Sequence, residues 1–274
     1  MNAVATIARK EVRDAIAGRW LVLYAAVFAV LALGLSYLGQ KNLGGLGFEN
    51  FSRTTASLLN LSLLLSPLIA LSLGAGSIAG ERDRGHLAYL LSQPISRLDL
   101  LLGKFAGLAS AIAIATIAGF GAGGLVIATF ASSVDVSTYI TLLCLVLALT
   151  AVMTGLGLLA SVVCTSRVQA LGVAMMVWFV AVLFFDLVLI GAVSQASLGG
   201  TGLLVTLLLN PVEIVRVLAI IQLEPDLEVL GPFGSYLLES LGATGATAVL
   251  SAALAAWAVI PVAAAAWLFA RQEI

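Results

Sequence analysis

Residues 139–164, "YITLLCLVLALTAVMTGLGLLASVVC", carry no charged side chain. An α-helix needs about 20 consecutive apolar residues to cross a bilayer, so this stretch alone predicts a membrane-spanning helix. Five further apolar runs lie on either side of it: Trp20–Leu38, Leu58–Ala79, Phe105–Phe130, Ala170–Val193 and Ala246–Ala270. Of the 274 residues, 61% are hydrophobic and only 10% are charged, whereas soluble domains are about 25% charged. The sequence therefore predicts an all-α, polytopic membrane bundle of six transmembrane helices, forming a single domain over residues 1–274.

The charges in the loops predict the orientation of these spans. If the N-terminus is inside, ten of the 13 Lys and Arg residues fall on the same side as it: Arg9, Lys10, Arg13, Arg19, Arg82, Arg84, Arg97, Lys104, Arg167 and Arg271. The other side holds Lys41, Arg53 and Arg216. Because cytoplasmic loops carry the excess of Lys and Arg, both termini are predicted to be cytoplasmic.

Two segments outside the spans have patterns of their own. Residues 3–19 place apolar side chains at helical spacing opposite Arg9, Lys10 and Arg13, which predicts an amphipathic helix on the inner membrane surface. A positive flank that only fixes orientation is the alternative. Residues 194–245 contain two apolar stretches, 203–209 and 214–223, that are too short to cross a bilayer. They are expected to be re-entrant or interfacial helices, broken by the prolines of Asn210-Pro211 and Glu224-Pro225.

The same outer segment is acidic. Arg216 is its only cation among the acids Glu213, Glu224, Asp226, Glu228 and Glu239. Because complementary charges steer protein association and set its register, we expect this segment to dock a periplasmic protein, with residues 214–223 as the apolar anchor. A lid packed over the mouth of the bundle is the alternative.

Several motifs that would indicate an enzyme or a metal site are excluded by their context. "GFGAGG", residues 119–124, lies within an apolar run and not after a strand, so close helix packing is predicted there and not nucleotide binding. No G-x-x-x-x-G-K-[ST] motif occurs, and one histidine with two cysteines about 30 Å apart on a helix cannot form a closed zinc site. No catalytic or metal site is predicted in this chain.

Asp186 is the one acid inside a predicted span. A charge there costs on the order of 3 kcal/mol, so Asp186 is a functional candidate, with a structural hydrogen bond as the alternative.

Residues 80–104, "GERDRGHLAYLLSQPISRLDLLLGK", hold seven charged residues and the only histidine, His86. Glu81 to Arg84 mix both signs of charge. Leu87, Leu90 and Leu91 lie on one face of a short predicted helix that stops before Pro94. A charged head followed by an apolar ridge predicts docking into a groove on a soluble partner. An ordinary polar loop is the alternative.

This connector resembles the signature of ABC-2 type transporter permeases. In that family the segment between the second and third spans reads G-E-R-x-x-G-T-L, L-L-S-x-P, I-S-R and L-L-G-K, and His86 stands where the family usually has Thr. The six spans, the N-terminal helix and the outer segment also fit, so the resemblance covers the whole chain. It implies that ATPase coupling rests on these residues: Glu81, Arg82, Asp83, Arg84, Gly85, Leu87, Leu90, Leu91, Pro94 and Arg97.

The resemblance also implies partners. They are a cytoplasmic ABC ATPase dimer that carries ATP and magnesium, a second copy of this chain and the lipid of a bacterial inner membrane; no nucleic acid is expected. "IARKEVRDAIAGRW", "FENFSRTTASLLNLSLLLSPLIAL" and "LLLNPVEIVRVLAI" are similar to permeases that act with a periplasmic β-helix protein in maturing the copper centres of nitrous-oxide reductase. The alternatives are an ABC-2 exporter of a drug, lipid or polysaccharide, and a membrane assembly protein that needs no ATPase.

Overall fold

A computed structural model describes residues 3–41, 47–130, 135–185, 187, 199–223 and 232–272, and the regular structure in these ranges is helical throughout. The elements are α1 (Ala3–Ala17), α2 (Trp20–Lys41), α3 (Gly47–Asp83), α4 (His86–Leu91), α5 (Arg97–Phe130), α6 (Val136–Val163), α7 (Arg167–Trp178), the π-helix η1 (Phe179–Phe184), α9 (Gly200–Leu208), α10 (Pro211–Leu223) and α11 (Pro232–Arg271). The predicted all-α class is confirmed.

The helices also match the predicted membrane spans. Among the described residues, stretches in α3, α5, α6, α7 with η1, and α11 are each long and apolar enough to cross a membrane. The described part of α2 meets the same test together with α1, to which it is bent by 64°. The pair α9 and α10 is bent by 115°, at the break predicted from Asn210-Pro211. The second predicted break follows the end of α10 at Leu223, and its own residues lie outside the described ranges.

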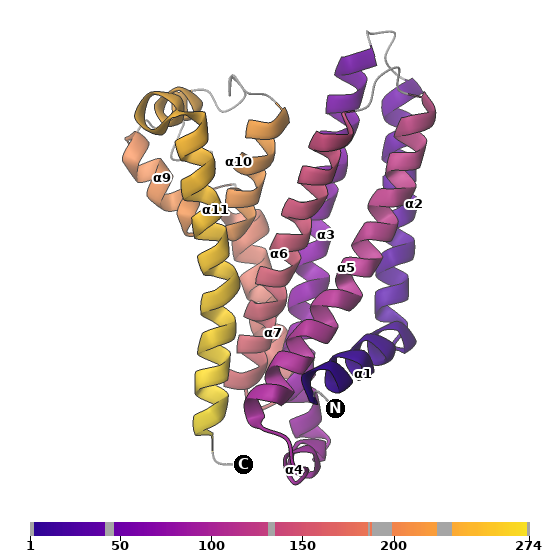
Figure 1. Cartoon of the computed structure of the whole chain (residues 1–274), viewed down its shortest axis with the longest axis vertical. Helices are drawn as coiled ribbons and strands as arrows, with labels where there is room; N and C mark the ends of the chain where they lie inside the picture. The colour runs from indigo at the N-terminus through magenta and orange to yellow at the C-terminus, as the bar shows by residue number, and fades with distance from the viewer. Residues whose placement is uncertain are drawn as a thin grey trace.

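Figure 1 shows how these elements are arranged. The long helices run side by side along the vertical axis, α9 and α10 lie at the upper end, and α4 lies at the lower end. The end of α11 lies at the α4 end as well, and α1 crosses the bundle there.

α1 packs on α5, where Cβ atoms added at Gly103 and Gly107 would stand 2.7 Å from Ile7 Cβ and 2.6 Å from Glu11 Cβ. These two glycines therefore allow α1 to lie directly against α5.

Glycines also bring other helices of the bundle together. A Cβ at Gly74 of α3 would stand 2.7 Å from the backbone oxygen of Thr154, and one at Gly157 of α6 would stand 2.6 Å from that of Leu71. α3 and α6 therefore touch backbone to backbone, as small residues permit in membrane bundles. In the GFGAGG stretch, a Cβ at Gly119 would stand 2.0 Å from Cδ1 of Phe28. This contact confirms the close packing predicted for that stretch.

Two side chains donate to backbone oxygens near irregular points of the helices. Pro67 interrupts the bonding of α3, and the indole Nε1 of Trp178 donates to the Leu64 oxygen at 3.0 Å. Asn210, at the bend between α9 and α10, donates from Nδ2 to the Ala181 oxygen of η1 at 2.6 Å. Its Oδ1 accepts from the backbone N–H of Val212 at 3.0 Å, which caps α10.

Candidate functional site

The end of α3 contacts several helices through consecutive charged residues. Glu81, Arg82 and Asp83 each bond a different part of the bundle, and α4 follows two residues later. We call residues 81–84 the charged junction. The sequence pattern predicted mixed charge here but not which helices it joins.

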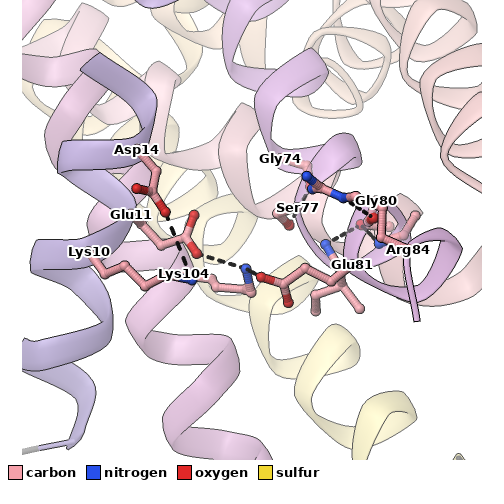
Figure 2. A network of polar contacts seen from close by, with 12 residues as sticks. Lys10, Glu11, Asp14, Gly74, Ser77, Gly80, Glu81, Arg84 and Lys104 are labelled. Carbon is pink, nitrogen blue, oxygen red and sulfur yellow. Dashed lines mark hydrogen bonds and ion pairs between the residues drawn. The ribbon is translucent and has the colours of Figure 1, made fainter. Parts of the chain in front are cut away.

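Glu81 lies in a buried ion triad. The ammonium of Lys104, on α5, donates to Oε1 of Glu81 and to Oε1 of Glu11, on α1, at 2.8 Å each. The side chains of Lys104, Glu11 and Glu81 are 2%, 13% and 11% exposed, so water does little to screen these pairs. Figure 2 shows Lys104 between the two carboxylates, with the exposed Lys10–Asp14 pair beside Glu11 on α1. The triad joins α1, α3 and α5 through one cation.

Arg82 and Arg97 hold the C-terminal end of α11. Arg82 donates from Nη1 to the backbone oxygen of Cys164, beside the end of α6, and from Nη2 to Oε1 of Gln272 at 2.7 Å. Arg97 donates to the backbone oxygens of Phe269, at 3.1 Å, and of Gln272. Both guanidinium groups are therefore bonded within the chain.

Asp83, Arg84 and Gly85 shape the turn into α4. Oδ2 of Asp83 accepts from the backbone N–H of Arg167 at 2.8 Å, where a carboxylate is favourable because α7 begins there. Arg84 donates from Nε to the Gly80 oxygen at 2.9 Å. Gly85 has a φ of 72°, a left-handed conformation that glycine adopts without the steric cost other residues incur.

Two leucines of the α4 ridge, Leu87 and Leu90, pack against the bundle. Leu87 is 2% exposed and packs with Leu100, Leu101 and Phe269, and Leu90 packs against the same cluster. The ridge therefore does not offer Leu87 to a partner, contrary to our expectation, because the bundle itself fills the groove. Tyr89 is 68% exposed and presents an aromatic side chain that the pattern did not single out. Pro94 follows α4 and is exposed; of the Leu91 side chain nothing is described.

The predicted outer site is described only in part. Glu213 is 3% exposed, and its Oε1 lies 2.7 Å from Nη1 of Arg216. Its carboxylate is therefore inside the fold and not on the outer surface. Glu224, Asp226 and Glu228 lie outside the described residues, as does the intramembrane candidate Asp186.

Sequence reasoning missed Glu11 and Gln272 as parts of this site. Lys104 closes the L-L-G-K part of the connector, and its charge beside an apolar run was a signal that it needs a carboxylate. Nothing in the order of residues shows that Glu11 lies within reach. In the described part of the chain, no three His, Cys, Asp or Glu side chains gather as a metal site would require.

Comparison with known proteins defines the class of this chain. Residues 5–274 match the description "ABC-2 family transporter protein", and the chain belongs to this family. It is similar to the "Probable ABC transporter permease protein NosY" of Stutzerimonas stutzeri, with 36% identity over 280 aligned positions that cover 99% of both chains. The protein of the same description from Pseudomonas aeruginosa is also 36% identical, over the full length of both chains. The protein is thus a multi-pass ABC permease of the NosY type and not itself the ATPase.

Proposed function

We propose that this chain couples ATP hydrolysis by a separate cytoplasmic ATPase to a periplasmic partner that matures the copper centres of nitrous-oxide reductase. The proposal places it in a bacterial inner membrane with both termini cytoplasmic, since ten Lys and Arg residues lie on that side. Its support is the full-length similarity to two permeases called NosY.

The observation that carries the coupling is the charged junction. A push on α4 reaches Glu81 and Asp83 within a few residues, and these side chains hold α5 and the start of α7. Arg82 extends the same connection to the ends of α6 and α11. A displacement at α4 therefore acts on several spans together and not on one loop.

A second copy of the chain is part of the proposal. Large apolar side chains on α7 and η1 remain exposed, among them Val168 at 79%, Met176 at 67% and Phe184 at 50%. We expect part of this surface to pack against a second permease subunit. Cross-linking in native membranes checks this, and a result with monomers alone contradicts it.

The ATPase contact is tested at Tyr89, the exposed large side chain of α4, because Leu87 on the opposite face of that helix is buried. Tyr89→Ala should weaken association with the ATPase by at least about 2 kcal/mol if Tyr89 is an anchor of the interface. Co-purification and stimulated ATP turnover measure this. Thermal stability of the permease should not change, since Tyr89 is 68% exposed.

Val136→Ala is the matched control, because Val136 is 59% exposed at the other end of the bundle. Unchanged ATPase association in Tyr89→Ala contradicts the proposed contact.

The copper role is tested in a strain whose own permease gene has been deleted. Complementation with the wild-type chain should restore copper content and the visible absorption of nitrous-oxide reductase, and Tyr89→Ala should not. A copper-filled reductase in the uncomplemented deletion strain contradicts this role and favours the exporter alternative.

The docking of a β-helix protein on the outer segment, with Glu224, Asp226 and Glu228 at its rim, stays a prediction.

A further inference from the structure

A polar cavity of about 620 Å³ lies beside the charged junction, between α1 and α3. Its lining runs along α3 from Arg84, near α4, to Ser72 and Leu73, about three helical turns away. The volume falls within the range of about 300–1,000 Å³ found for small-ligand sites. The ion triad forms one wall of this cavity, and the coupling role leaves the rest of it unexplained.

Two guanidinium groups converge on one side of the cavity. Nη2 of Arg84 and Nε of Arg167 stand 3.6 and 3.9 Å from the same point, the position of a Cβ at Gly80. In the described part of the chain no carboxylate pairs with either group; Arg84 donates Nε to the Gly80 oxygen. Two like charges held this close favour an anion between them, and a guanidinium fork matches the oxygens of a phosphate.

Glu81, which lines the cavity, has an unsatisfied acceptor. Oε2 of Glu81 is buried and accepts no hydrogen bond within the described residues, while Oε1 is bound to Lys104. Lys104 also donates to Glu11, so the triad holds two carboxylates and one ammonium. A small cation with N–H donors would bind here. Because Glu81 and Arg84 are only three residues apart, at the end of α3 and just after it, this cation site adjoins the anion site.

An apolar hollow is lined by the residues that follow the cavity lining along the chain. Ala17 and Gly18 line the cavity, and the next residue, Arg19, lines an apolar hollow of about 480 Å³ together with Val22, Leu23 and Ala26. Val22 and Leu23 are 53% and 54% exposed. A ligand held in the cavity could therefore extend an acyl chain along α2.

We propose that this cavity binds the phosphoethanolamine headgroup of a membrane phospholipid. The phosphate lies between Arg84 and Arg167, the ammonium donates to Oε2 of Glu81, and an acyl chain follows the hollow at Val22 and Leu23. A phosphate group and a primary ammonium a few bonds apart match both poles of the cavity, and the hollow favours a lipid over a free phosphate compound.

Native mass spectrometry of the purified, delipidated full-length chain tests the proposal. Phosphatidylethanolamine, phosphatidylcholine and phosphatidylglycerol with identical acyl chains are added separately, without any ATPase. The wild type should bind phosphatidylethanolamine about tenfold more tightly than the other two, because only its headgroup offers N–H donors to Glu81. Arg84→Gln, alone and with Arg167→Gln, should weaken all three lipids by about tenfold or more. Glu81→Gln should weaken phosphatidylethanolamine alone, to the level of phosphatidylcholine.

Arg13→Gln is the matched control, since Arg13 is an exposed cation of α1 that does not line the cavity. Because Arg84 is exposed, its single variant should fold even if Glu81→Gln does not.

Unchanged lipid binding in the Arg84 and Arg167 variants overturns the site. Equal wild-type affinity for the three lipids overturns the ammonium assignment, and free phosphoethanolamine that binds as tightly as the lipid overturns the acyl-chain assignment. Lipid binding by monomers but not by dimers would show that the second subunit covers the cavity, and would also overturn the proposal.

Discussion

Lys104 is a single cation shared by two carboxylates in a nearly dry setting. Its side chain is 2% exposed, and both of its partners are mostly buried. Removing one member of such a group leaves a buried charge uncompensated, and this costs far more than the loss of a surface pair. The position therefore matters more for stability than any exposed charge nearby.

Lys104→Met should lower the free energy of unfolding by about 3–5 kcal/mol, because it leaves Glu11 and Glu81 buried without their cation. Denaturant unfolding of the purified chain in detergent measures the change. Lys10→Met is the control: its partner Asp14 lies at 3.8 Å and both side chains are more than half exposed, so its effect should stay below about 1 kcal/mol. The triple variant Glu11→Gln, Glu81→Gln, Lys104→Met should regain part of the free energy of unfolding that Lys104→Met loses, because no buried charge of the triad remains. Equal stability of Lys104→Met and wild type would contradict this account.

Among the elements, the bent pair α9 and α10 depends on one side chain at its corner. Asn210 is 2% exposed, caps α10 through its oxygen and bonds the Ala181 carbonyl of η1 through its nitrogen. A π-helix is rare and often marks a functional position. The pair α9 and α10 is thereby tied to η1, near the end of the described α7–η1 stretch.

Asn210→Ala should cost about 2 kcal/mol, because it removes both the cap and the donor to Ala181. Asn210→Ser should cost only about 1 kcal/mol, since serine can still cap α10 but is too short to reach η1. Both variants should increase hydrogen exchange of the backbone amides at residues 179–184. The free energy of unfolding should distinguish the two variants. Unchanged exchange there in Asn210→Ala would show that the bond to Ala181 does not hold η1.

The sequence was informative about elements whose signal is local. Pro211 predicted the break between α9 and α10, and the spacing of apolar residues predicted α1 and the spans. The apolar pattern of α4 was recognised, but the burial of Leu87 in the chain's own core was not predicted, because Leu87 has the same spacing whether it meets a partner or that core. The partners of Lys104 and Arg82 were not predictable, since Glu11 and Gln272 lie far from them along the chain and only packing brings them near.

At the scale of the whole molecule, the asymmetry of Lys and Arg between the two ends predicts the orientation in the membrane. Gln93 is exposed just after α4, and Val136 is exposed at the other end of the bundle. In a background with Cys144 and Cys164 replaced by alanine, and without the ATPase, Val136→Cys should react with an impermeant maleimide on intact spheroplasts. Gln93→Cys should react only after permeabilisation. The reverse pattern would place α4 on the outside and contradict the coupling proposal.

The ion triad also constrains how this sequence can change over evolutionary time. Exchanging the charges of Glu81 and Lys104 would keep that pair intact, but it would set a new carboxylate at position 104 against Glu11. A lineage that loses Lys104 must therefore alter two distant codons as well, and the intermediates carry an unpaired buried charge. We expect relatives to retain all three residues or to replace all three, so that any two of these positions should change together.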